Sequence, residues 1–198
     1  MKKNGTTIAV VLGVALGAAL PLAAQAQATL PGVYVGVGAG QAEPLQYDAC
    51  DTRPTCKKKG SAYRFFGGWQ FSRNFGVEVA YSDLGKASSS SSTLNETIKV
   101  RVSELTLVGS YPASERFSIY GKVGGYYAQT TADTTQSGVS TRVKESNGGL
   151  TFAGGLQYFV TPSLALRGEG QNYMKVGGGR LGDSDYVAYT VGLLWKFR

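Results

Sequence analysis

The chain has no histidine, and it contains few of the other residues that carry chemistry at protein sites. Its 198 residues include two cysteines, two methionines and two tryptophans. Histidine is the usual general base of small hydrolases and acyl-transfer enzymes, and nothing in the sequence suggests a serine–lysine pair in its place. The sequence therefore predicts no catalytic residues, no bound cofactor and a protein that is not an enzyme.

The two cysteines lie close together in the sequence. Cys50 and Cys56 flank a short polar segment, and such a pair can oxidise to a disulfide in an exported protein. A metal site is the alternative, but the chain has no histidine and no second cysteine pair to complete a set of ligands. Asp183 and Asp185 are a weak calcium candidate, for which a solvated loop is the favoured interpretation. We predict a Cys50–Cys56 disulfide and no metal.

Long apolar runs are also absent, except for one near the N-terminus. Lys2 and Lys3 precede an apolar run at residues 8–22, and small residues follow at alternate positions. This order predicts a secretory signal peptide over residues 1–28, cleaved after Ala26 or Ala28. A single membrane anchor is the alternative, but the run is short for one. Without another long apolar run, the mature chain can span a membrane only as a closed β-barrel.

Apolar residues at every second position are abundant, most clearly in residues 186–198. One face of this stretch consists of Val187, Tyr189, Val191, Leu193, Trp195 and Phe197. Period-two alternation predicts a strand with one apolar face and one more polar face. The last strand of a soluble sandwich is the alternative. The stretch is longer than most soluble strands and suits a tilted strand that crosses a bilayer.

Seven more stretches alternate in the same way, and the connections between them alternate in length. The predicted strands are residues 32–41, 61–72, 75–84, 97–111, 116–128, 148–160, 164–175 and 186–198. Long connections at 42–60, 85–96, 129–147 and 176–185 alternate with three tight turns. Within 97–111, Val100 and Val102 share the face of Glu104, which predicts a bulge or an exit from the membrane.

This pattern predicts an all-β fold, an eight-stranded antiparallel up-and-down transmembrane β-barrel formed by residues 29–198. An even number of strands with short and long connections is typical of the outer membrane of a Gram-negative bacterium. Both termini would then be periplasmic and the long loops extracellular. A closed barrel has no free sheet edge, which predicts a monomer.

Two stretches resemble a known family. Residues 65–71 with 74–85, and the Leu-Arg-Gly-Glu-Gly-Gln-Asn-Tyr stretch at 166–173, are similar to the transmembrane domain of the outer membrane protein A family. The resemblance implies the same barrel, with a network of charges inside it. It also implies that the barrel-assembly machinery reads the C-terminal aromatic residues, here Tyr189, Trp195 and Phe197. The peptidoglycan-binding domain of longer members follows the barrel and is not carried over.

The alternation places charged side chains inside the predicted barrel. These are Arg64, Glu78, Glu104, Lys122, Arg167 and Glu169. Counted from the tight turns, Glu104 and Lys122 would lie level on neighbouring strands. Charges in a narrow lumen must pair, because an unpaired buried charge costs several kcal/mol. We interpret the set as an ion-pair network that closes the lumen, with a switchable gate as the alternative.

The net charge is positive, at +7. An exported chain does not meet nucleic acid, so outer-membrane lipid and lipopolysaccharide phosphates are the expected partners. A basic cluster at Arg53, Lys57, Lys58 and Lys59 lies beside the cysteine pair. It is a candidate contact for lipopolysaccharide or another ligand, and a purely solubilising loop is the alternative.

Three functions fit the sequence. They are a structural envelope barrel with a closed lumen, a narrow pore of low conductance, and an adhesin that binds through its loops. The predicted charge network favours the structural role.

Overall fold

The computed structural model describes residues 31–45, 55–57, 59–90, 94–136, 139–177 and 183–197. The predicted signal peptide lies outside these residues, as do Cys50, Arg53 and Lys58, and the side chains of Cys56 and Lys57 are not described. The predicted disulfide therefore stays a prediction. Among the described residues, no helix is long and apolar enough to cross a membrane.

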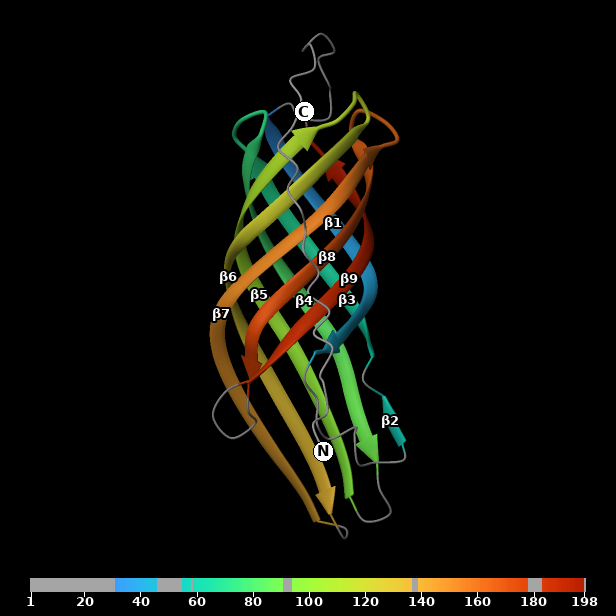
Figure 1. The fold of residues 1–198 in the computed structure, drawn as a ribbon, viewed down its shortest axis with the longest axis vertical. Helices are drawn as coiled ribbons and strands as arrows, with labels where there is room; N and C mark the ends of the chain where they lie inside the picture. Colours follow the sequence, from blue (N-terminus) through green and yellow to red (C-terminus); the bar gives the residue numbers. More distant parts are fainter. Residues whose placement is uncertain are drawn as a thin grey trace, which may run out of the picture.

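The described residues form nine strands. They are β1 (Gly32–Pro44), β2 (Thr55–Lys57), β3 (Gly60–Gln70), β4 (Phe75–Ser90), β5 (Leu94–Pro112), β6 (Phe117–Gln136), β7 (Val139–Phe159), β8 (Leu164–Gly177) and β9 (Asp183–Lys196). Eight of them pair antiparallel in the order β4-β3-β1-β9-β8-β7-β6-β5, and β4 also pairs with β5. This last pairing closes the sheet and confirms the predicted eight-stranded barrel (Figure 1). The additional strand, β2, pairs only with β4.

The alternation of side chains separates an apolar outer wall from the interior. On β9, Tyr189, Val191 and Trp195 point outward and are 62%, 68% and 50% exposed, whereas Ala188 and Leu194 are buried inside. Successive side chains of a strand point to opposite faces, so one strand serves both surfaces. The outer wall is the surface that a barrel presents to lipid.

Three short turns join β3 to β4, β5 to β6 and β7 to β8, and they share one arrangement. A serine or threonine hydroxyl accepts a hydrogen bond from the backbone N–H three residues later. The pairs are Ser72 with Phe75 at 3.0 Å, Ser114 with Phe117 at 3.1 Å, and Thr161 with Leu164 at 3.0 Å. The hydroxyl satisfies an amide that the turn would leave without a protein partner. The start of β1 and the end of β9 lie at this same end of the barrel (Figure 1).

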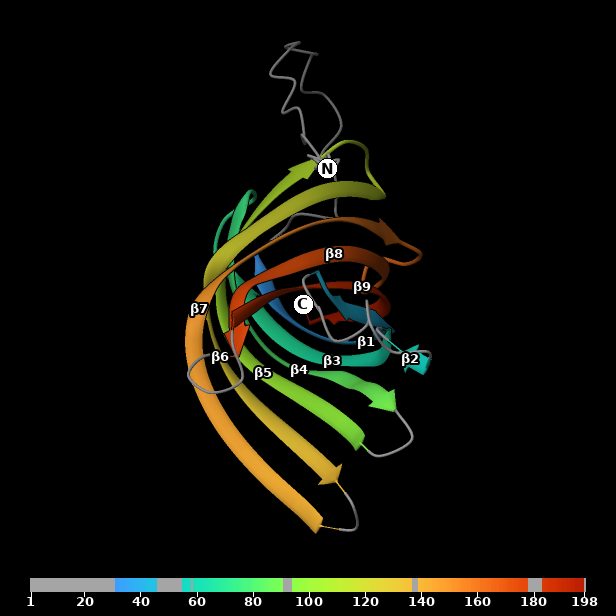
Figure 2. The same cartoon turned by 60° about the horizontal axis from the view of Figure 1, so that its bottom comes forward.

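The predicted long connections are shorter than expected, because the strands continue through much of them. The serine-rich stretch at 85–96 belongs mainly to β4 and β5, and 129–147 is almost entirely paired between β6 and β7. Threonine is frequent in this part of β6 and has a high β propensity while staying compatible with water. Figure 2 shows these strands running beyond the ends of β8 and β9.

Of the two alternatives predicted for this part of β5, a bulge or an exit from the membrane, the bulge is not found there, and a bulge lies in the neighbouring strand β4 instead. The β5–β6 register is continuous, whereas the β4–β5 register shifts between Asp83 and Lys86. Gly85 adopts a left-handed φ of 77° there, and its N–H donates to Asp83 Oδ1 at 2.9 Å. Val100 and Val102 break the polar pattern of the inner face because they are buried in an apolar layer inside the barrel.

The turn hydroxyls contribute to stability. We expect Thr161→Ala to lower the free energy of unfolding by about 0.5–1.5 kcal/mol, because the Leu164 N–H loses its side-chain acceptor. Thr161→Ser keeps the hydroxyl and is the matched control. Urea unfolding in detergent micelles, followed by tryptophan fluorescence, measures both. Equal losses in the two variants would show that the hydrogen bond contributes nothing.

Candidate functional site: the charged interior of the barrel

The six charged residues predicted for the lumen come together inside the barrel. Arg64 comes from β3, Glu78 from β4, Glu104 from β5 and Lys122 from β6, while Arg167 and Glu169 both come from β8. Their side chains are at most 5% exposed. Residues separated by up to about a hundred positions in the sequence thus form one cluster, because barrel closure brings the inner faces of these strands together.

Glu78 is a carboxylate that all three cations of this cluster contact. One of its carboxylate oxygens, Oε1, lies 3.1 Å from Arg64 Nη2 and 3.0 Å from Lys122 Nζ. The other, Oε2, lies 2.7 Å from Arg167 Nη1 and accepts a hydrogen bond from the Tyr34 hydroxyl at 2.9 Å. All three cations of the cluster therefore meet at a single carboxylate.

Glu169 contacts the same three cations from the opposite wall, with Arg64 Nη1 the most distant at 3.6 Å from its Oε1. Its Oε1 accepts from Lys122 Nζ at 2.8 Å, and its Oε2 lies 3.1 Å from Arg167 Nη2. The Tyr120 hydroxyl donates to Glu169 Oε2 at 2.7 Å and accepts from Arg167 Nε at 2.8 Å. The Arg167 guanidinium also lies over the Tyr120 ring, 4.2 Å from its centroid.

Glu104 pairs chiefly with Arg64, which also reaches Glu78. A hydrogen bond joins Arg64 Nη2 to Glu104 Oε1, and Gln171 Nε2 donates to Glu104 Oε2 at 2.7 Å. Gln171 also donates to the Thr151 hydroxyl at 2.8 Å and accepts from Arg64. Residues of β3 and β8 therefore bind Glu104 at least as closely as residues of the adjacent strands β4 and β6.

The prediction that Glu104 and Lys122 lie level on adjacent strands is wrong. The β5–β6 register places Glu104 opposite Tyr126 and Lys122 opposite Val108. Counting from the turns ignores the stagger between tilted strands of a barrel. The long lysine side chain brings its Nζ within 3.9 Å of Glu104 Oε1, but its closer partners are Glu78 and Glu169.

The cluster is electrically balanced. Three cationic and three carboxylate side chains share the site, and each cation lies within 4 Å of at least two carboxylates. Desolvation of several charges is costly and is offset only where every charge is paired with good geometry. Removal of one charged partner therefore destabilises the protein more than removal of two oppositely charged partners together.

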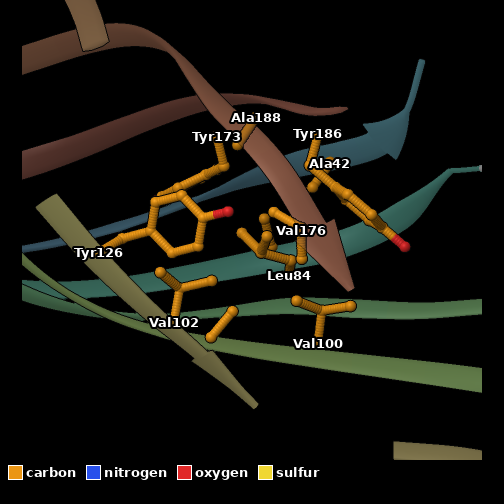
Figure 3. Packing of buried hydrophobic residues seen from close by; sticks show 11 residues of the cluster. Ala42, Leu84, Val100, Val102, Tyr126, Tyr173, Val176, Tyr186 and Ala188 are labelled. Carbon is orange, nitrogen blue, oxygen red and sulfur yellow. The ribbon is translucent and has the colours of Figure 1, made fainter. Parts of the chain in front are cut away.

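Apolar layers lie on both sides of the charges. Toward the short turns, Tyr34, Phe66 and Leu194 pack with Ala80, Phe159 and Ala165. Toward the other end, a larger group includes Leu84, Val100, Val102, Tyr126 and Tyr173 (Figure 3). The rings of Tyr126 and Tyr173 meet edge to face at 5.6 Å between centroids. The described part of the lumen is thus filled by three successive layers of side chains.

Little space remains beside the network. A cavity of about 30 Å³ lies on the side of the short turns, between Arg167 and Lys196, and one of about 10 Å³ lies beside Arg64 and Tyr173. A cavity needs about 10–15 Å³ of such water-accessible space to hold one water molecule. The two cavities therefore have room for isolated waters.

The sequence pattern does not by itself single out the polar and aromatic partners of the network. Tyr34, Tyr120, Tyr173 and Gln171 bind its charges directly. The available signal was their register, since each occupies the inward position of its strand. Which inward side chains meet depends on the barrel's stagger, which the sequence pattern does not specify.

The other candidate residues whose side chains the structure describes lie away from the charge network. Tyr189, Trp195 and Phe197 are exposed on the outer wall, and Lys59 is exposed near the start of β3. Asp185 accepts a hydrogen bond from the Lys175 backbone N–H at 2.8 Å. Lys175 has a φ of 58° at the bulge in β8, so Asp185 supports that bulge. Across the described residues, no group of three potential ligands is arranged to hold a metal ion.

The balance of the cluster is testable. We expect Lys122→Met to lower the free energy of unfolding by roughly 3–5 kcal/mol, because Glu78 and Glu169 lose a shared cation in a buried site. The neutral double variant Lys122→Met/Glu169→Gln should lose clearly less. Lys144→Met is the control. Lys144 is exposed on the β6–β7 ribbon, which is the part of β6 and β7 within residues 129–147. Urea unfolding in micelles measures all three, and a double variant as unstable as the single one would contradict charge balance.

Comparison with known proteins supports the fold and the environment. The sequence model of the OmpA-like transmembrane domain matches residues 28–198. Outer membrane protein P5 of Haemophilus influenzae is 32% identical over 195 residues, covering 89% of this chain and 52% of that protein. Outer membrane protein A of Escherichia fergusonii is 29% identical over 173 residues, covering 86% and 48%. The chain spans about half the length of these relatives.

Solved structures show the same fold at lower sequence identity. Neisserial surface protein A has a TM-score of 0.60 at 17% identity, covering 84% of this chain and 97% of that one. OprG of Pseudomonas aeruginosa has a TM-score of 0.60 at 15% identity, covering 87% and 99%. Together with the closed barrel, the family match shows that this chain belongs to the OmpA-like transmembrane domain family and is an integral β-barrel of the outer membrane.

Proposed function

We propose that the protein has a structural role in the envelope of a Gram-negative bacterium, as an outer-membrane barrel whose lumen is permanently closed. The observation that carries this proposal is the balanced ion-pair cluster between two apolar layers. Opening the lumen would require several buried charges to separate and two apolar layers to part. A barrel closed in this way adds a rigid, impermeable element to the membrane.

The proposed orientation in the membrane rests on where the first and last strands of the barrel begin and end. The start of β1, the end of β9 and the three short turns share one end of the barrel. Short turns are periplasmic in bacterial outer-membrane barrels, and longer connections are extracellular. We therefore assign both termini to the periplasm and the extended β4–β5 and β6–β7 ribbons to the cell exterior.

The proposed partners, oligomeric state and lack of catalysis rest on the barrel's place in the outer membrane and on its interior. Outer-membrane lipid and lipopolysaccharide surround the barrel, and the barrel-assembly machinery inserts it by reading Tyr189, Trp195 and Phe197. The described strands leave no open edge at the level of the apolar band, which favours a monomer. A role other than catalysis is favoured because the buried charges bind one another and line no cleft that would admit a substrate.

Surface binding through the extended ribbons is the second candidate. The β6–β7 ribbon is paired as far as Gln136 and Val139, whereas β7 pairs with β8 only from Thr151 onward. It is thus a preformed projection, which reduces the entropy cost of binding. Ail of Yersinia pestis, an attachment invasion locus protein with a TM-score of 0.53 and 15% identity, has been solved with the heparin analogue sucrose octasulfate.

Conductance separates a closed barrel from a pore. We expect the refolded protein to give no discrete current steps in a planar bilayer at low or high salt, with folding verified by its heat-dependent gel mobility. Lys122→Ala should also be silent, because the apolar layers remain on both sides. Reproducible steps in the unmodified protein would establish a narrow pore, and steps that appear only in Lys122→Ala would establish a gate.

Shortening the β6–β7 ribbon tests the second candidate. Thr131 and Lys144 are cross-strand partners, so a two-residue Asn-Gly turn joining them removes the projection while keeping the register. We expect normal folding, because β7–β8 pairing lies well below the cut. If the ribbon binds sulfated oligosaccharides, binding to intact cells should fall to background. Unchanged binding would exclude the ribbon.

A further inference from the structure

A basic groove lies on the outer wall where β3, β4 and β5 run side by side. It has a volume of about 550 Å³ and is lined by Lys59, Tyr63, Asp83, Lys86, Lys99 and Arg101, together with Gly60, Ser61 and Gly85. Four of these side chains are cationic and one is acidic. The groove belongs to the outer surface and is separate from the charge cluster inside the barrel.

The β4 bulge creates this groove. Before the bulge, the odd-numbered residues Tyr81 and Asp83 face outward and Ser82 is buried inside. The extra residue reverses the alternation, so that Lys86 faces outward directly opposite Lys99 of β5. Without the bulge, the strand's alternation would direct the Lys86 side chain into the lumen.

The resulting arrangement of charges is unfavourable on its own. Like charges directly opposite one another on adjacent strands destabilise a sheet, and Arg101 is the next outward residue after Lys99 on β5. Within the groove, Asp83 is the single acidic residue, and its Oδ2 lies 3.7 Å from Arg101 Nε. An excess of positive charge therefore remains at Lys59, Lys86 and Lys99.

Asp133, a carboxylate close enough to Lys99 for an electrostatic interaction, already has a cationic partner. Asp133 of β6 accepts a hydrogen bond from Arg142 Nε at 2.5 Å. This hydrogen bond, with smaller contributions from Lys99 and Lys144, holds the pKa of Asp133 below its usual range. Asp133 therefore does not take the place of an external anion beside Lys86 and Lys99.

The groove begins where the apolar band ends. Tyr63, Tyr81 and Tyr127 are 56%, 44% and 51% exposed on three of the strands β3 to β6, at the level where aromatic residues mark a membrane interface. Lys86, Lys99 and Arg101 follow within a few residues on the side of the extended ribbons. In the orientation proposed above, this is the level of the phosphates in the outer leaflet.

We propose that the groove binds a phosphate of the outer-leaflet glycolipid, lipopolysaccharide, between Lys86 and Lys99. The proposal rests on the extracellular assignment of the ribbons. The groove opens sideways on the lipid-facing wall, and exposed Tyr63 at its lower rim offers a surface for the acyl chains of the same molecule. Lys59, part of the basic cluster predicted from the sequence, joins the site, and the bulge at Gly85 is the feature that builds it.

The test is the binding of fluorescent lipopolysaccharide to the full-length refolded protein in detergent micelles. We expect Lys86→Gln/Lys99→Gln to weaken binding roughly tenfold or more, because two charge-assisted contacts are lost. Lys86→Arg/Lys99→Arg should retain binding. Arg73→Gln/Arg116→Gln is the matched control, since it removes the same charge from exposed residues at the short-turn end and should change binding less than twofold.

Stability provides a second readout that does not depend on activity. Without lipopolysaccharide, Lys86→Gln should unfold at the same or a slightly higher urea concentration, because the opposed charges are relieved. With lipopolysaccharide, the unmodified protein should be stabilised, since a ligand that binds only the folded state raises its stability. The double glutamine variant should lose that gain.

The outcomes distinguish a lipopolysaccharide phosphate from free phosphate. They also distinguish failure of the proposed groove from failure of the proposed orientation. Enzymatically dephosphorylated lipopolysaccharide should bind weakly to every variant, and competition by inorganic phosphate alone would show a free-anion site instead. Equal binding by the glutamine variant and the charge-matched control overturns the groove. If lipopolysaccharide binds at this groove in micelles but surface labelling places the ribbons in the periplasm, the orientation fails and the site chemistry stands.

Discussion

The pairing of β4 with β5 is the constraint on which the rest of the structure depends. A membrane offers no water to backbone amides and carbonyls, so a sheet that spans it must leave no edge. Closure of the eight strands satisfies this requirement. It also divides every strand into an inner and an outer face, and the chemistry of the protein is divided in the same way. Paired charges lie between apolar layers inside, apolar and aromatic residues lie outside, and cations lie where the outer wall meets water.

The interior shows how a narrow barrel is filled. Eight strands leave room for side chains and not for a wide channel. Arg64, Lys122 and Arg167 are balanced by three glutamates, and tyrosine hydroxyls and Gln171 bind further polar atoms of the cluster. The flanking apolar layers limit the access of water to this cluster, which strengthens each ion pair and raises the cost of separating any of them. Stability and closure of the lumen are therefore consequences of the same packing.

A single extra residue in β4 determines which of its following side chains face the outer surface. The bulge around Gly85 reverses which residues face outward, because side chains alternate with a period of two. Lys86 consequently stands opposite Lys99, in an arrangement that the sheet alone does not favour. Bulges are often found at barrel rims, where they redirect side chains, and here the redirected side chain completes a basic groove at the edge of the apolar band.

The sequence by itself determined the eight strands that form the barrel, their inward and outward faces and the six charges of the lumen network, because alternation with a period of two is a local property of the chain. It also located the three short turns. It missed the extent of the β6–β7 ribbon, since threonine-rich polar strands resemble loops in composition. Only the tertiary structure decided which charges meet, that Val100 and Val102 belong to an apolar layer, and that the bulge lies in β4. These depend on the stagger between neighbouring strands, which closure of the barrel fixes and the pattern of one strand does not contain.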